Sequence, residues 1–208
     1  NRNGGFLELI KVFGRQVLKY QKKIFTIRGG KDIMDYNELD VKARPGAFST
    51  LDMEVLVPDI LRMESEEIYL EVGVDKGKSL SVVKMVAKEG VKIFGVDIKQ
   101  IPEPVEGTTF FLGDSVEVAK QWNHGEISVL FIDGNHTYPG CHRDIEAWLP
   151  HLKENGVILF HDCDESSPGV MWAVAEAVCM GKLKGMFTLN KYNNKNTSMA
   201  RIGPRYDI

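Results

Sequence analysis

Five short apolar segments alternate with helix-forming segments after residue 67, and this alternation constrains the fold more than any other feature. The apolar segments are 68–73, 92–97, 108–113, 127–133 and 156–162, and each is hydrophobic almost throughout rather than at every second residue. Continuous hydrophobicity is typical of parallel strands that are covered on both faces. Helices are expected between them at 78–89, 115–122, 138–150 and 169–181. The pattern predicts a doubly wound α/β fold with right-handed crossovers.

The two ends of the chain depart from this pattern. Near the C-terminus, two apolar stretches flank the polar turn NNKN, which predicts an antiparallel hairpin and brings the mostly parallel sheet to seven strands. Residues 6–25 carry apolar side chains at helical spacing beside many lysines, which predicts a helix docked on the main domain or on a second subunit of a homo-oligomer. A basic face that binds a membrane surface or an anionic partner is the alternative.

The segment between that helix and the sheet divides into two parts. Residues 29–50 are polar and contain Gly and Pro, which indicates a connector or mobile flap, and 49–63 predicts a short helix capped by Ser49 or Thr50. We therefore expect a helical extension or lid over 1–60 and a ligand-binding domain over 61–208.

Composition narrows the classes of partner. The chain has 208 residues, a net charge of −3 and 43% hydrophobic residues, so nucleic acid is not expected as the main partner. No apolar run is long enough to span a membrane, and the first residues lack the pattern of a secretion signal. The three cysteines show no paired spacing, which favours a reducing, cytoplasmic location over a disulfide framework.

Polar side chains follow each predicted parallel strand, where ligands of open α/β sheets bind. The residues at these positions are Glu71 and Gly73, then Asp97, then Gly113, Asp114 and Ser115, then Asp133 and His136, and finally His161 and Asp162. Five strand ends with polar chemistry are difficult to explain by packing alone. The sequence therefore predicts a ligand site along this edge of the sheet.

The stretch EVGVDKGKS at residues 71–79 limits the identity of that ligand. Its glycines are separated by three residues, whereas a triphosphate-binding loop needs four, and the glycine pattern of a dinucleotide site is absent. Glu71 would repel phosphate but suits an ammonium group. Asp97 is placed to accept hydrogen bonds from ribose hydroxyls, and Asp114 from an adenine amine. A nucleoside that carries an amino acid, S-adenosylmethionine, fits this combination.

Longer motifs carry a family resemblance over residues 67–203. The segments YLEVGVDKGKSL, IFGVDIKQ, FLGDSVEV and VLFIDGNHTYPGCHRDIEAWLPHLKENGVILFHDC resemble successive motifs of class I S-adenosylmethionine-dependent methyltransferases, in the branch of macrocin O-methyltransferase and cephalosporin-hydroxylase-like enzymes. The resemblance implies a Rossmann-like sheet and methyl transfer to a hydroxyl of a small acceptor such as a sugar, phenol or natural product. The cofactor-binding residues it implies are Glu71, Gly73, Gly77, Ser79, Asp97, Ile98, Gly113, Asp114, Ser115, Asp133, His136 and Tyr138.

The same resemblance bears on catalysis. Relatives in this branch often hold Mg²⁺ with an Asp after the fourth strand and an acidic pair after the fifth, which implies a metal set of Asp133, His161 and Asp162. A histidine favours ions softer than Mg²⁺, and His161 and Asp162 alternatively position the substrate. His136, with Asp133 beside it, is the predicted general base; it alternatively binds a ligand or orders its loop. Asn135 stands where some relatives carry a carboxylate, which shifts proton removal to His136 or to a metal-bound substrate.

Two other functions compete with this prediction. A binding protein that retains the cofactor pocket without catalysis would account for Asn135. A nucleotide-dependent enzyme that uses Lys78 and Ser79 as a phosphate loop would account for the glycines, although the loop is one residue too short.

Overall fold

The computed structural model describes residues 35–191 and 198–204. A compact unit begins at Tyr36. The helix predicted over 6–25 and the turn at 193–196 lie outside the described residues. Their roles in a subunit interface or hairpin turn stay predictions.

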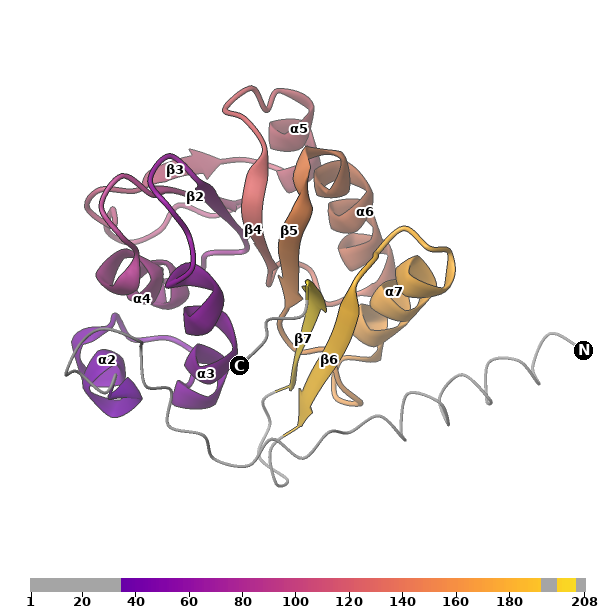
Figure 1. Ribbon diagram of the computed structural model, residues 1–208, viewed down its shortest axis with the longest axis horizontal. Helices are drawn as coiled ribbons and strands as arrows, with labels where there is room; N and C mark the ends of the chain where they lie inside the picture. Colours follow the sequence, from indigo (N-terminus) through magenta and orange to yellow (C-terminus); the bar gives the residue numbers. More distant parts are fainter. Residues whose placement is uncertain (1–34, 192–197, 205–208) are drawn as a thin grey trace, which may run out of the picture. The chain divides into compact units, whose positions relative to one another are not determined.

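A seven-stranded sheet with the order β3-β2-β1-β4-β5-β7-β6 forms the centre of the unit (Figure 1). The strands are β1 (Ile68–Val72), β2 (Lys92–Asp97), β3 (Thr109–Leu112), β4 (Ile127–Ile132), β5 (Leu152–Phe160), β6 (Met186–Lys191) and β7 (Ser198–Gly203). The first five pair in parallel, whereas β7 is antiparallel to both β5 and β6. The predicted Rossmann-like sheet and C-terminal hairpin are confirmed.

Two apolar layers explain why the parallel strands are hydrophobic throughout. Alternate side chains of β1, such as Leu70 and Tyr69, enter different core clusters, and both are fully buried. One cluster packs beneath α5 (Ser115–Lys120), α6 (Tyr138–Trp148) and α7 (Pro168–Cys179). The other packs beneath α3 (Thr50–Ile60) and α4 (Lys78–Val86). Figure 1 shows these two groups of helices on opposite faces of the sheet.

Strand order places the first and fourth strands side by side. Val72 of β1 is paired with Val96 of β2 and with Ile132 of β4, so these three strands end at one level. Ile132 is in turn paired with Phe160 of β5. The polar residues that follow these strands are therefore brought together at one edge of the sheet.

The segment before the sheet is more structured than its sequence indicated. Part of the expected connector forms α2 (Tyr36–Lys42), whose Tyr36 and Leu39 pack against the core cluster beneath α3. Helix α3 begins with a capping box between Ser49 and Asp52, so Ser49 rather than Thr50 is the N-cap residue. A connector over 36–42 was therefore a wrong prediction, because two apolar contacts in a polar segment were not recognised. Whether residues 1–60 act as a lid stays a prediction.

A buried ion pair joins α3 to the antiparallel end of the sheet. Arg201 of β7 contacts both carboxylate oxygens of Asp59, with Nε–Oδ2 and Nη2–Oδ1 distances of 2.7 and 2.9 Å. Asp59 is 2% exposed, so this geometry fixes the helix against the sheet.

The start of β5 also differs from the prediction. The strand begins at Leu152 rather than at 156, since Ile127 of β4 pairs with Leu152 across a register shift. Residues 153–155 are exposed and polar, so hydrophobicity gave no sign of this first part of the strand. Within the described residues, no helix has the length and apolar character needed to cross a membrane.

Candidate active site

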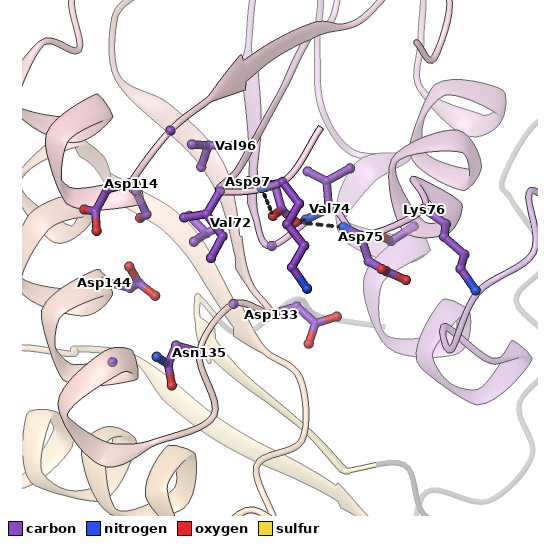
Figure 2. Close-up of a pocket in the computed structure, with 18 of the residues that line it drawn as sticks. Val72, Val74, Asp75, Lys76, Val96, Asp97, Asp114, Asp133, Asn135 and Asp144 are labelled. Atoms are coloured by element: carbon purple, nitrogen blue, oxygen red, sulfur yellow. Dashed lines mark hydrogen bonds between the residues drawn. The ribbon is translucent and has the colours of Figure 1, made fainter. Parts of the chain in front are cut away.

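A cavity of about 620 Å³ opens at the carboxyl ends of the parallel strands. Its lining combines the loops after β1, β2, β3 and β4 with residues 46–48 and the first half of α6. Eight of the predicted cofactor-binding residues line it: Gly73, Ser79, Asp97, Ile98, Gly113, Asp114, Ser115 and Asp133. Figure 2 shows acidic side chains from several of these loops around one space.

The turn after β1 requires glycine at its first position. Gly73 has a φ of +88°, and a Cβ atom there would lie 2.2 Å from the carbonyl oxygen of Asp133. The backbones that follow β1 and β4 therefore approach too closely for any side chain. Gly77 also has a positive φ and is the N-cap residue of α4, but it does not line the cavity.

Asp97 organises the loop that follows β1. Its Oδ2 atom accepts hydrogen bonds from the backbone N–H groups of Val74 and Asp75, each at 2.9 Å, and Oδ1 accepts one from Lys99 at 2.8 Å (Figure 2). Three backbone donors hold the carboxylate at the end of β2 and leave it on the cavity wall. Asp97 therefore fixes the shape of the site as well as providing a polar group to it.

Glu71 lies behind this wall rather than on it. The side chain is fully buried and accepts hydrogen bonds from the hydroxyls of Tyr69 and Ser79, at 2.8 and 2.5 Å. Burial raises the pKa of Glu71 to about 8, and the carboxylates of Asp133 and Asp97 act in the same direction. Glu71 thus supports Ser79, which does line the cavity, and does not itself face the space in which an ammonium group would lie.

The end of the cavity near β3 contains two aspartates. Asp114 caps α5, since its Oδ1 accepts hydrogen bonds from Val116 and Glu117, and its Oδ2 lies 3.5 Å from Nη2 of Arg143. Asp144 of α6 is only 7% exposed and lines the same end of the cavity. Burial raises its pKa to about 6.

Beside the cavity, two histidines bridge the ends of β4 and β5. His136 Nε2 lies 3.3 Å from Oδ1 of Asp133, and Nδ1 lies 3.5 Å from Oδ2 of Asp162. His161 Nδ1 lies 3.3 Å from the same two carboxylate oxygens, and its Nε2 lies 3.4 Å from Asp52. Asp162 has a positive φ of 51°, an unfavourable backbone conformation that occurs often at functional sites.

These contacts shift the proton affinities of the cluster. The contact with Asp133 raises the pKa of His136. Burial alone would lower the pKa of His161, but its contacts with Asp133, Asp162 and Asp52 outweigh burial and raise it to about 12. Burial would raise the pKa of Asp133, yet both imidazoles hold it below its usual value. The cluster therefore favours an imidazolium at His161 beside the carboxylate of Asp133.

The predicted residues do not all come together. The Tyr138 hydroxyl donates a hydrogen bond to Glu176 at 2.5 Å, and Tyr138 does not line the cavity. Of the predicted metal set, the buried His161 contacts Asp133 and Asp162 through Nδ1 and Asp52 through Nε2. Asp133, His136 and Asp162 instead offer three donor atoms within 4.8 Å of one another. Two carboxylates and an exposed imidazole fit a divalent ion that accepts a nitrogen ligand.

Sequence reasoning missed three residues of this region. Phe48 lines the cavity and packs edge-on against Phe131, Asp52 contacts His161, and Asp144 lies at the β3 end. For Asp144 there was a usable signal, since it stands among apolar residues at helical spacing in α6. No local signal connects Phe48 or Asp52 to the strand ends.

Comparison with known proteins agrees with this architecture. Residues 70–163 match the model of a family described as a methyltransferase domain. The uncharacterized protein R132 of Acanthamoeba polyphaga mimivirus is 29% identical over 130 residues, which cover 53% of this chain and 58% of that protein. The chain thus spans little more than half the length of this relative.

Solved structures share the fold. CalS11, a TDP-rhamnose 3'-O-methyltransferase of calicheamicin biosynthesis, superposes with a TM-score of 0.56 at 17% identity, covering 74% of this chain and 77% of CalS11. MycE is a methyltransferase of the mycinamycin pathway, solved in complex with Mg and SAH (S-adenosylhomocysteine). It superposes with a TM-score of 0.60 at 17% identity, and the match covers 82% of this chain and 54% of MycE. The chain is therefore similar to a methyltransferase domain over residues 70–163, and it shares the fold of these solved methyltransferases.

Proposed function

We propose that the protein transfers the methyl group of S-adenosylmethionine to a hydroxyl group of a small molecule. The observation that carries this proposal is the cavity, in which Asp97 lies at the end of β2 and Asp133 lies at the end of β4 beside His136. Asp97 suits the ribose of the methyl donor, and Asp133 with His136 suits the hydroxyl of the methyl acceptor. A single cavity thus offers polar groups for both substrates.

On the donor side, the adenosyl group would lie across the ends of β1, β2 and β3. Asp97 would accept hydrogen bonds from the ribose hydroxyls, and the turn at Gly73 would allow close approach of the ligand. Ser79 and Lys78 line the cavity at the start of α4, where free N–H groups favour a carboxylate such as that of the methionine portion. Lys78 is also held at 2.7 Å by Asp40 of α2.

On the acceptor side, the hydroxyl oxygen attacks the methyl carbon while the carbon–sulfur bond breaks, and its electron pair stays on sulfur. The hydroxyl proton passes to the neutral form of His136, whose contact with Asp133 raises its pKa and so makes it a stronger base. The cofactor leaves as S-adenosylhomocysteine, so atoms and charge balance. Holding both reactants in one cavity lowers the barrier by removing their freedom to separate.

A small hydroxylated acceptor is favoured by the surroundings of Asp133. His136, Asp162 and Asn135 are polar groups near that end, and they can form hydrogen bonds with a sugar or phenol. The two similar structures include an O-methyltransferase that acts on TDP-rhamnose. Nucleic acid is not proposed as the acceptor, because the chain carries a net charge of −3.

A divalent metal would be held by Asp133, His136 and Asp162, with His161 behind the two carboxylates. Such an ion would lower the pKa of an acceptor hydroxyl and orient it. We expect Mn²⁺ or Zn²⁺ to bind more tightly than Mg²⁺, because an imidazole belongs to the set. Calorimetric titration of each ion into the protein and an Asp162→Asn variant measures this directly, and equal heats in both proteins would exclude the site.

Two measurements test the proposal as a whole. Calorimetry should detect S-adenosylhomocysteine binding, whereas Mg-ATP and NAD should give no heat; the reverse pattern would exclude the methyl-donor site. Transfer of labelled methyl groups to a panel of sugars, phenols and natural products then separates an enzyme from a binding protein. Binding of the adenosyl ligand without transfer to any hydroxylated acceptor would favour the non-catalytic alternative.

A further inference from the structure

We propose that Asp144, and not Asp114, is the residue that distinguishes adenine from other purine bases in the cavity. The inference rests on the proposed function, since it concerns the same adenosyl ligand. It assigns the contact with the exocyclic amine of adenine to Asp144, whereas the sequence predicts Asp114. Both aspartates line the β3 end of the cavity, so their surroundings decide between them.

Asp114 is already committed to other contacts. Its Oδ1 accepts hydrogen bonds from two backbone N–H groups at the start of α5, at 2.9 and 3.4 Å, and its Oδ2 lies next to the guanidinium of Arg143. Its side chain is 48% exposed, so water competes for any remaining capacity. A ligand amine would gain little selectivity from such a group.

Asp144 has the opposite environment. It is 93% buried, and the one side-chain hydrogen bond that influences its pKa comes from Ser115. The Ser115 oxygen accepts a hydrogen bond from the Trp148 indole at 2.7 Å, so its own proton is free to be donated toward Asp144. A buried tryptophan, a serine and an aspartate thus form a chain that holds the carboxyl group in place.

The remaining capacity of Asp144 faces the cavity. Figure 2 shows its carboxyl group between Asp114 and Asn135, directed toward the space that Asp97 reaches from the other side. Its Oδ2 atom lies 3.3 Å from the position that a Cβ atom on Gly134 would take, so the neighbouring wall is bare backbone. A flat base can therefore lie against that wall with its amine edge toward Asp144.

The chemistry of a buried carboxyl group makes this contact selective. Adenine presents an N–H donor at position 6, which an oxygen of Asp144 can accept. Hypoxanthine presents an oxygen there, which would face the carboxyl group without a proton between them. A site with a buried polar group rejects a ligand that leaves the group unpaired far more strongly than an exposed site does.

Competition between S-adenosylhomocysteine and S-inosylhomocysteine tests the proposal. We expect the wild-type protein to prefer the adenosyl ligand by roughly 30-fold or more. The Asp144→Asn variant should lose most of this preference, because an amide can donate to the oxygen at position 6. The control is Glu146→Gln, which makes the same change of charge at an exposed residue of α6 that pairs with Lys182. This variant should keep the wild-type ratio of the two affinities.

The outcomes separate the two proposals. If the wild-type protein binds neither ligand, the proposed function fails. If it binds the adenosyl ligand but Asp144→Asn keeps the wild-type ratio, or Asp114→Asn removes the preference instead, only the present inference is wrong. Should Asp144→Asn not fold, a crystal structure of the wild-type complex decides: an amine nitrogen within about 3.2 Å of Asp144 supports the inference, and contact with Asp114 alone overturns it.

Discussion

The carboxylate of Asp97 is held by three backbone N–H groups, whereas that of Asp133 is held by the side chains of two histidines. The proposed donor side of the cavity is therefore fixed by the strand ends and their loops. The proposed acceptor side is a network of charged side chains, in which His161 also contacts Asp52 of α3. Backbone contacts give a fixed shape, while paired imidazoles and carboxylates allow protons to move.

The largest expected effect separates these two sides. Asp133→Asn should reduce the rate of methyl transfer by roughly 10²–10⁴-fold, because His136 loses the carboxylate that raises its pKa and makes it a base. The affinity for S-adenosylhomocysteine should change by less than about fivefold, since Asp133 belongs to the acceptor side. Single-turnover kinetics and calorimetry on the same samples measure both quantities. Equal losses in rate and affinity would contradict the division into two sides.

On the donor side, Asp97→Ala should weaken S-adenosylhomocysteine binding by at least about 100-fold. The ribose loses its acceptor, and the N–H groups of Val74 and Asp75 lose theirs, at a cost of about 1–3 kcal/mol for each group left unpaired. Calorimetry gives the affinity and thermal unfolding gives the stability. An Asp97→Ala protein that binds the ligand normally would show that the adenosyl group lies elsewhere.

Glu71 provides a test through pH. Its pKa is raised from 4.5 to about 8, so the folded state binds more protons than the unfolded state between these values. The free energy of unfolding of the wild-type protein should therefore fall as pH rises from about 5 to 8. In the Glu71→Gln variant, the decrease in the free energy of unfolding over this pH range should be smaller by roughly 2–5 kcal/mol.

Chemical denaturation at several pH values measures the dependence for Glu71. The exposed Glu117→Gln variant is the control and should follow the wild-type slope. Identical slopes in the Glu71 variant and the wild type would mean that Glu71 is ionised in the folded protein.

The smallest expected effect concerns the segment before α3. Arg44 donates hydrogen bonds to the carbonyl oxygens of Glu103 and Pro104, at 2.5 and 2.6 Å, and so ties this segment to the loop after β2. Arg44→Ala should weaken cofactor binding by about 2–10-fold, because residues 46–48 line the cavity. Arg62→Ala, which removes a hydrogen bond on the surface of α3, is the matched control. The same affinity in both variants would mean that the tie does not influence the donor side.

The parallel sheet could be predicted because its strands are buried on both faces and end in polar residues. Asp97 and Gly73 followed from that pattern, since the carboxyl ends of neighbouring parallel strands share one edge. The start of β5 could not be predicted, because residues 153–155 belong to the strand but carry exposed polar side chains. Helix α2 was missed for a related reason, since only two of its side chains pack against the core.

The arrangement of side chains within the site was less accessible. Glu71 was placed correctly at a strand end, yet whether it faces the cavity or the core depends on Tyr69 and Ser79, which are partners that spacing does not reveal. His161 was predicted as a metal ligand, but Asp52, from a helix more than 100 residues earlier, faces its other nitrogen. Contacts between distant segments decide such orientations, and a single sequence does not encode them in a local pattern.

The most direct test of the two-sided cavity is a crystal structure of the protein with S-adenosylhomocysteine. We expect the ribose hydroxyls to lie within hydrogen-bonding distance of Asp97, and the sulfur atom to lie on the side of the cavity that faces Asp133. A ligand bound away from Asp97, or one whose sulfur points away from Asp133 and His136, would contradict this expectation.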